Sequence, residues 1–152
     1  MNTAPQLPAG TRILVVDDTQ DIRFVLAYYL NQKGAEVLTA ETASEGIETA
    51  LREKPNLILM DMQLPDMDGY IATRRLKQSG FAAPIIAMTG NTIVGMRERC
   101  IRAGCSDYLS KPVPLGHLMR TIIQYLAVPS TNASANGSGT GGGLSLKNSA
   151  RN

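Results

Sequence analysis

Short apolar runs alternate with longer segments of helical periodicity between residues 11 and 128. The runs cover residues 12–16, 36–40, 56–60, 84–88 and 107–110. The first, third and fourth are almost continuously hydrophobic, which is typical of strands buried on both faces. Helical segments of ten residues or more lie between them, and the apolar residues of the last one form a single stripe with a period of 3.6 residues. Five strands, each followed by a helix, predict a parallel α/β sheet with helices on both faces, since right-handed crossovers leave few alternatives.

Turn and cap residues agree with this division of the chain. We expect Gly34 to close the first helix, Ser44 to cap the second, and Gly104 to end the fourth. Pro65 and Gly69 are expected to break the loop after the third strand. The positions of these turn and cap residues therefore support the five strand–helix units.

Length and composition indicate one domain. The chain has 152 residues, and from Pro129 onward it consists mostly of Gly, Ser, Asn, Thr and Ala. Such a segment buries too little apolar surface to offset the entropy lost on ordering. We expect a flexible extension over residues 1–10, a folded domain over 11–128, and a disordered tail or linker over 129–152.

Charge and cysteine content narrow the possible functions. A formal net charge of +2 gives no strong attraction for nucleic acid, so we expect no direct DNA binding. Cys100 and Cys105 are too few for a disulfide framework or a four-ligand metal site, and we interpret them as ordinary intracellular thiols. The chain has no signal-like N-terminus and no apolar segment of the ~20 residues that span a bilayer. We expect a cytoplasmic protein without membrane insertion.

Polar residues follow four of the apolar runs. Asp17 and Asp18 come after the first strand, Asp61 after the third, Thr89 after the fourth and Lys111 after the fifth. Ligands of open parallel sheets bind beyond the carboxyl ends of the strands. The predicted fold therefore gathers three carboxylates, a hydroxyl and an ammonium at one edge of the sheet.

Three carboxylates in one pocket need compensation. Two unit charges ~4 Å apart repel by about 4 kcal/mol at an effective dielectric constant of 20. A bound divalent cation would relieve this repulsion, and an all-oxygen ligand set favours Mg²⁺, with Mn²⁺ as a substitute. A nucleophilic carboxylate, a metal ion, a lysine and a hydroxyl are the components of phosphoryl transfer.

The motifs at these strand ends give the chain a family resemblance. It resembles the receiver domain of two-component response regulators over about residues 11–127, through the acidic pair Asp17 and Asp18, the loop 60–69, the segment 88–90, and Lys111-Pro112. Each motif alone is weak, but the four in this order are specific. The resemblance implies a flavodoxin-like (βα)5 doubly wound sheet with strand order 2-1-3-4-5. It also implies a signalling phosphoacceptor rather than an enzyme, with Mg²⁺-dependent self-phosphorylation and slow self-dephosphorylation.

The resemblance further implies a role for each site residue. Asp61 is the phosphoacceptor, and it takes the phosphoryl group from a sensor histidine kinase or a histidine phosphotransfer protein. Asp18 ligates Mg²⁺ directly, Asp17 holds the ion through water or assists from nearby, and the backbone carbonyl of Gln63 completes the protein ligands. Lys111 contacts the acyl phosphate.

Two residues match the family's switch. Thr89 moves inward to hydrogen-bond a phosphoryl oxygen while Tyr108 rotates, which changes the surface of the fourth helix, the fifth strand and the fifth helix and so controls a protein partner. The Lys111-Pro112 bond resembles the family's cis-proline turn. Gln63 and Asn91 stand at the variable positions beside the pocket and leave the lifetime of the phosphate open.

Two surface features bear on where partner proteins dock. The fourth helix has three arginines, at 97, 99 and 102, which form either a solvated face or a docking surface for an acidic partner. Phe24, Tyr28 and Tyr29 exceed what one apolar stripe requires, so aromatic surface is expected where kinases or phosphotransfer domains dock in this family. His117, the single histidine, is interpreted as a surface residue.

One alternative is a close variant of the receiver hypothesis, and two belong to other functional classes. The chain could be a receiver excised from a hybrid histidine kinase, with the Gly- and Ser-rich tail as linker. A phosphohydrolase of the haloacid dehalogenase type also uses a nucleophilic Asp, but it needs a second Asp where this chain has Gln63. A flavodoxin-like FMN binder is disfavoured because Asp17 and Asp18 would repel the FMN phosphate.

Overall fold

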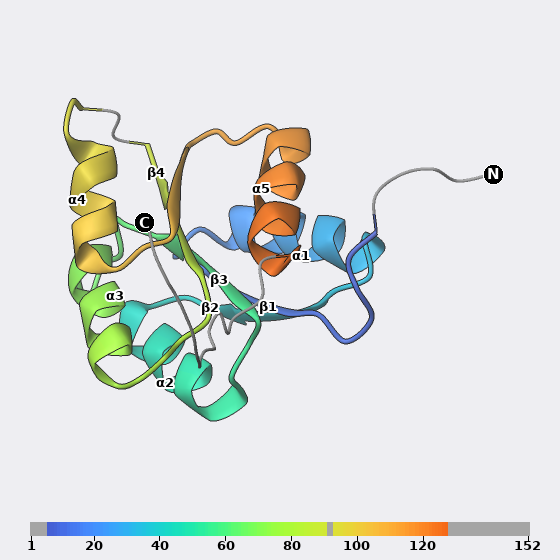
Figure 1. The fold of residues 1–152 in the computed structure, drawn as a ribbon, viewed down its shortest axis with the longest axis horizontal. Helices are drawn as coiled ribbons and strands as arrows, with labels where there is room; N and C mark the ends of the chain where they lie inside the picture. Colours follow the sequence, from blue (N-terminus) through green and yellow to red (C-terminus); the bar gives the residue numbers. More distant parts are fainter. Residues whose placement is uncertain (1–5, 91–92, 128–152) are drawn as a thin grey trace, which may run out of the picture.

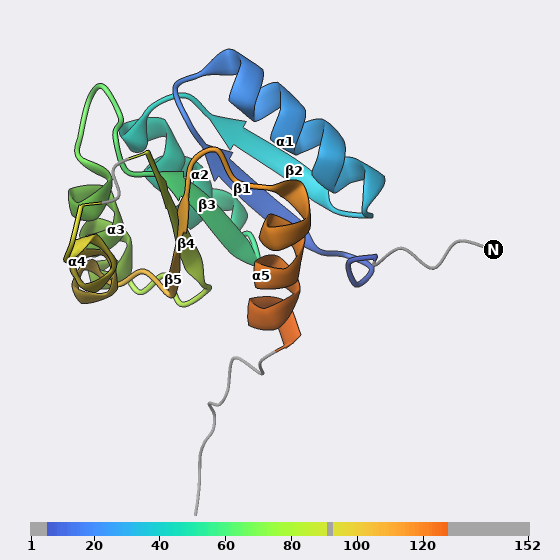
Figure 2. The ribbon, with the colours of Figure 1, turned by 90° about the horizontal axis from the view of Figure 1, so that it is seen from above.

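A five-stranded parallel sheet lies between two layers of helices (Figure 1). The structure is a computed structural model, and it describes residues 6–90 and 93–127. The elements follow the order β1 (Arg12–Val16), α1 (Gln20–Gln32), β2 (Glu36–Ala40), α2 (Ala43–Glu53), β3 (Leu57–Asp61), α3 (Gly69–Gln78), β4 (Ile85–Thr89), α4 (Met96–Ala103), β5 (Asp107–Ser110) and α5 (Leu115–Ala127). Helices α1 and α5 cover one face of the sheet, and α2, α3 and α4 cover the other (Figure 2).

The strand order is β2-β1-β3-β4-β5, and every neighbouring pair is parallel. This confirms the doubly wound flavodoxin-like arrangement and its predicted order. Strands β3 and β4 each lie one residue further along than the apolar pattern predicts. Pro84 has no N–H to donate to the sheet, although its carbonyl accepts from Ile58 N at 3.0 Å. Asp61 pairs with Met88 and Thr89 pairs with Ser110, so these two residues are the last of their strands rather than the first residues after them.

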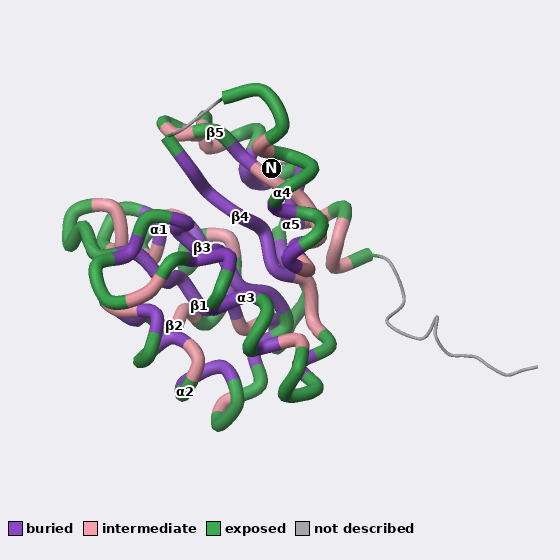
Figure 3. Tube along the Cα trace, turned by 90° about the vertical axis from the view of Figure 1, so that its left-hand side faces the viewer, coloured by how far each residue is buried: buried purple, intermediate pink, exposed green. Residues whose placement is uncertain are grey.

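The core has two halves, one on each side of the sheet. Every residue of β3 and β4 is buried, and so are the last four of β1, whereas the edge strand β2 is partly exposed (Figure 3). Alternate residues of each central strand face opposite halves, as the pleat requires. The prediction of three strands buried on both faces is confirmed. These strands form the rigid support for the site at their carboxyl ends.

One predicted helix cap is wrong. Thr42, not Ser44, caps α2, because Thr42 has extended backbone and its hydroxyl accepts from Glu45 N at 3.1 Å, while Ser44 already lies inside the first turn. Gly104 ends α4 as predicted, with a φ of 116° that favours glycine. Gly34, at φ 100°, follows Lys33, the C-cap of α1. Gly69 does not interrupt the loop after β3 but begins α3.

The segment before β1 is partly packed. Leu7, which was expected to lie in a flexible extension, is buried among the residues of the α1 side and donates its N–H to Lys33 O at 2.8 Å. The predicted limits of the domain otherwise remain predictions, and the tail 129–152 lies outside the described residues. Across 6–90 and 93–127, no helix is both long enough and apolar enough to cross a bilayer.

Candidate functional site

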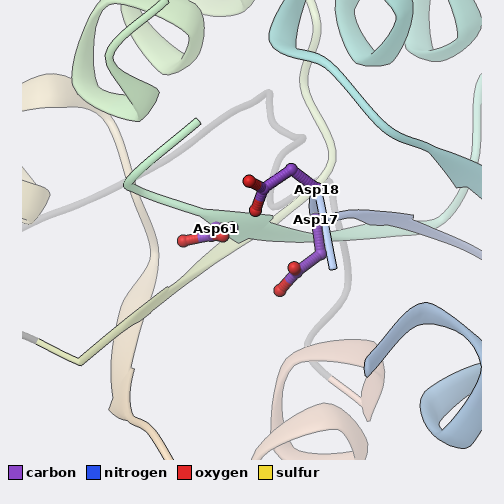
Figure 4. Close-up of side chains that lie close together, drawn as sticks. All are labelled: Asp17, Asp18 and Asp61. Carbon is purple, nitrogen blue, oxygen red and sulfur yellow. The ribbon is translucent and has the colours of Figure 1, made fainter. Parts of the chain in front are cut away.

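Three carboxylates meet at the carboxyl edge of the sheet. Asp17 and Asp18 directly follow β1, and Asp61 ends β3, the strand that pairs with β1. One oxygen of each side chain lies within 4.8 Å of an oxygen of the other two, and Figure 4 shows the three side chains emerging from these neighbouring strands. The structure therefore brings the predicted acidic residues together.

The three carboxylates differ in their access to water. Asp17 is 0% exposed and Asp61 is 3% exposed, whereas Asp18 is open to solvent. Three carboxylate oxygens so close together form a hard, oxygen-only donor set, which is what Mg²⁺ prefers. The donor chemistry of these residues therefore fits a magnesium ion.

Lys111 supplies the positive charge within this cluster. Its Nζ lies 2.9 Å from Asp17 Oδ2 and 3.3 Å from Asp61 Oδ2. The residue follows β5, where its N–H donates to Thr89 O at 2.8 Å, and the Lys111-Pro112 peptide bond is cis. One half-buried ammonium thus contacts both buried carboxylates.

The surroundings shift two pKa values in the cluster. Burial raises the pKa of Asp61 above its ordinary value of 3.8, and the Gln63 N–H and the nearby Lys111 charge offset this only in part. Burial also acts to lower the pKa of Lys111, but its hydrogen bond to Asp17 and the charges of Asp61 and Asp17 together raise it. The ammonium therefore stays charged at neutral pH, and an ionised Asp61 carries a cost in the absence of a metal ion.

This cost gives a pH-dependent prediction. In magnesium-free buffer at neutral pH, Asp61→Asn is expected to raise the free energy of unfolding, because it removes an ionised carboxylate whose burial is unfavourable. Because the folded-state pKa of Asp61 is raised, its ionisation destabilises the fold above that pKa, and protonation removes the penalty. The stability difference should shrink as the pH falls toward 3.8, the ordinary pKa. Urea denaturation of both proteins across this range measures it; a difference that grows toward acid would contradict the assignment.

The loop between β3 and α3 holds Gln63 beside the phosphoacceptor candidate. Gln63 donates its N–H to Asp61 Oδ1 at 3.0 Å and forms an antiparallel bridge with Asp68. Gly69 closes the loop so tightly that a Cβ there would lie 2.6 Å from Met62 Cα and 2.8 Å from Asp61 O. Only glycine fits this approach. The main chain at Gln63 is therefore fixed next to the Asp61 carboxylate.

The two predicted switch residues lie on adjacent strands. Thr89 is 1% exposed at the end of β4, and it pairs with Ser110 of β5. Tyr108 is half-buried against the core on the α4 side, and its hydroxyl accepts from Ser110 Oγ at 3.4 Å. Their movement on phosphorylation stays a prediction. Asn91, the second variable position, lies outside the described residues.

Exposed aromatic residues cover part of α1, as expected. Phe24 is 73% exposed and Tyr28 is 63% exposed, with Val25 between them also exposed. Tyr29 is half-buried, and its hydroxyl donates to Leu115 O at 3.4 Å. The aromatic surface of α1 therefore consists of Phe24 and Tyr28, while Tyr29 belongs to the contact with α5. His117 is exposed on α5.

Sequence reasoning missed two sets of contacts around the site. Asp66 accepts from two backbone N–H groups at the start of α2. Arg99, one of the three arginines of α4, stacks over the Tyr70 ring at 3.9 Å and lies 3.7 Å from Asp68. Asp66 and Asp68 were visible as members of the loop motif, but their partners come from helices that only the fold brings close.

Comparison with known proteins identifies the family. Residues 13–123 match the response regulator receiver domain family. Protein PilH of Pseudomonas aeruginosa is 37% identical over 118 residues, which cover 76% of this chain and 98% of PilH. The sensor histidine kinase RcsC of Escherichia coli is 34% identical over 113 residues, which cover 74% of this chain but 12% of RcsC.

The fold is also similar to solved structures of receiver domains. A CheY-like response regulator receiver domain protein from Methanospirillum hungatei superposes with a TM-score of 0.73 at 33% identity, over 76% of this chain and 93% of that one. The family match covers most of the chain, and the sheet order and the acidic edge agree with it. The chain belongs to the response regulator receiver domain family.

Proposed function

We propose that Asp61 is the phosphoacceptor of this receiver domain and takes its phosphoryl group from a phosphohistidine on a sensor histidine kinase or a histidine phosphotransfer protein. The observation that carries the proposal is the convergence of Asp17, Asp18, Asp61 and Lys111 within a few ångströms at the carboxyl edge of the sheet. Phosphoryl transfer depends mainly on positioning and charge neutralisation, and these residues supply both.

The chemistry follows from the side chains. An oxygen of the Asp61 carboxylate attacks phosphorus, the bond from phosphorus to the imidazole nitrogen breaks, and that nitrogen keeps the electron pair. Asp17, Asp18, Asp61 and the backbone carbonyl of Gln63 would hold Mg²⁺ or Mn²⁺, which when bound neutralises charge on the phosphoryl oxygens. Lys111, held by Asp17, faces the Asp61 carboxylate and contacts the acyl phosphate that forms.

Phosphorylation of Asp61 would act by changing a surface that a partner protein binds. Thr89 hydrogen-bonds the new phosphoryl group, Tyr108 turns inward, and the surface formed by α4, β5 and α5 changes its fit to a protein partner. The side-by-side placement of β4 and β5 supports this coupling, because Thr89 and Ser110 are register partners and Tyr108 lies two residues before Ser110. We place the protein in the cytoplasm, where it would meet both the kinase that forms phosphohistidine and its protein partner.

The comparisons and the site bear differently on the hybrid-kinase, phosphohydrolase and FMN-binding alternatives. The similarity to a 12% segment of RcsC leaves open a receiver that works inside a hybrid kinase, and the same Asp61 chemistry would apply there. The phosphohydrolase alternative is not favoured, because Gln63 occupies the position of the required second acid and its side-chain amide cannot transfer a proton as a carboxyl does. The acidic edge likewise disfavours an FMN phosphate.

Self-phosphorylation from a small phosphodonor tests the proposal. The full chain is incubated with acetyl phosphate and Mg²⁺, quenched within seconds and measured by intact mass, beside a sample with a chelator in place of the metal. The expected result is a gain of one phosphoryl group in the Mg²⁺ sample, with Mn²⁺ as an effective substitute. Equal gain with and without metal, or no gain at any time point, would contradict the proposed site.

A further inference from the structure

Asp66 ties the loop between β3 and α3 to the beginning of α2. Its Oδ1 accepts from Ala43 N at 2.8 Å, and its Oδ2 accepts from Ser44 N at 3.0 Å. The first N–H groups of a helix have no partner within the helix. Thr42 satisfies the N–H of Glu45, while Asp66, from a different part of the chain, satisfies the two that precede it. The Asp66 carboxylate is thus a tertiary cap of α2.

The loop that contains Asp66 is closed at its base. The bridge between Gln63 and Asp68 and the hydrogen bond from Gly69 N to Met62 O at 3.2 Å bring its two ends together. Asp66 lies between Gln63 and Asp68 in sequence, within the loop that this base closes. Its two hydrogen bonds therefore fix the orientation of the loop relative to α2.

Helix α2 packs against β1, the strand that Asp17 and Asp18 directly follow. A Cβ at Gly46 would lie 2.8 and 3.0 Å from the two methyl carbons of Val16, so the helix approaches β1 as closely as a glycine allows. Val16 directly precedes Asp17 and Asp18. One helix therefore contacts both the end of β1, which carries the acidic pair, and the loop that carries Gln63.

We propose that Asp66 is a positioning residue for the divalent cation, because its clamp on α2 sets the spacing between the Asp18 carboxylate and the Gln63 backbone carbonyl. The proposal rests on the proposed function, in which those two groups are ligands. The hydrogen bonds from Ser44 and Ala43 lower the pKa of the Asp66 carboxyl, so it is ionised at neutral pH. A charged acceptor at a helix N-terminus also has favourable interaction with the helix dipole.

The test compares Mg²⁺ affinity in the full chain. Mg²⁺ is titrated into ¹⁵N-labelled native protein and the variants Asp66→Ala and Asp66→Asn, and the shifts of the Asp18 and Gln63 amides are followed. Loss of a partner that bonds a ligand directly commonly weakens metal binding by about 10- to 100-fold. Asp66 acts through the loop and α2 rather than through a bond to a ligand, so Asp66→Ala is expected to raise the Mg²⁺ Kd by about tenfold, the lower end of that range. Asp66→Asn, which keeps one acceptor oxygen, should give a smaller rise.

Two control variants separate positioning from general effects. Thr42→Ala removes the other cap of the same helix end but no contact to the loop, and Glu48→Gln removes a carboxylate of α2 that lies 3.8 Å from Arg52. Both should leave the Mg²⁺ Kd within about twofold of the native value. A Kd in Asp66→Ala that matches the native value, or that matches Thr42→Ala, would overturn the proposal.

A measurement without metal keeps the two proposals distinguishable. Amide hydrogen exchange at Gln63 and Gly69 in metal-free protein should be several-fold faster in Asp66→Ala than in Thr42→Ala, because the loop loses its clamp. Unchanged exchange would overturn the clamp itself. If the native chain bound no Mg²⁺ while exchange responded to Asp66→Ala, the metal part of the proposed function would fail and the clamp would stand without a metal role.

Discussion

Lys111→Met is expected to lower the free energy of unfolding by about 3 kcal/mol in magnesium-free buffer. The substitution removes the ammonium that contacts Asp17 and Asp61, and both carboxylates are buried. Removing one partner of a buried ion pair typically costs about 3–5 kcal/mol, because the remaining charge is left uncompensated. We expect the lower end of this range because the Lys111 side chain is 22% exposed to water.

Added Mg²⁺ should restore more stability to Lys111→Met than to the native protein, since the ion would replace the missing positive charge. Urea denaturation of both proteins with and without Mg²⁺ measures this difference. Lys77→Met is the matched control, because Lys77 is also partly buried but contacts Ala83 O at 3.3 Å and the Phe81 ring. Its loss should cost less than about 1 kcal/mol. Equal losses in the two variants would contradict the role assigned to Lys111.

Asp61→Asn is expected to slow phosphoryl uptake from acetyl phosphate by at least about a hundredfold. Asparagine has the size of aspartate and keeps an oxygen that can accept from Gln63 N, so the loop should stay in place. The amide, however, is no nucleophile toward phosphorus, and the variant also lacks one of the three carboxylates of the metal cluster. The rate of mass gain in the presence of Mg²⁺ measures the effect.

Asp107→Asn provides the control for Asp61→Asn. Asp107 is also an aspartate on a strand, but it is the first residue of β5, at the end of that strand away from the site. Its side chain contacts the Tyr125 hydroxyl at 3.0 Å. Its uptake rate should stay within about twofold of the native rate. Uptake in Asp61→Asn within tenfold of native would show that another group accepts the phosphoryl group.

The buried central strands were the most predictable part of the fold. Their near-continuous apolar runs gave the element type, and the alternation with helices gave the parallel sheet. The pattern ended β3 and β4 one residue early, because it treats a polar side chain as a strand end. Asp61 and Thr89 nevertheless complete their strands. For Asp61, the contact with Lys111 makes burial of the carboxylate tolerable.

The site was predictable where a topological rule applies. Parallel strands have their carboxyl ends at one edge, so Asp17, Asp61 and Lys111 had to converge once the strands were assigned. Contacts between helices and loops followed no such rule. Thr42 and Ser44 are both good cap residues, and only the backbone geometry at the start of α2 decided between them. The partners of Asp66 likewise depend on how α2 packs against β1.

Chemical localisation of the phosphoryl group shows which residue accepts it. The native chain is phosphorylated with acetyl phosphate and Mg²⁺, the acyl phosphate is reduced with borohydride, and the digested protein is sequenced by mass spectrometry. An aspartyl phosphate is reduced to homoserine, so we expect homoserine at position 61 and at no other aspartate. Homoserine at Asp17, Asp18 or Asp66, or a phosphoryl group that survives reduction on a serine, threonine or histidine, would contradict it.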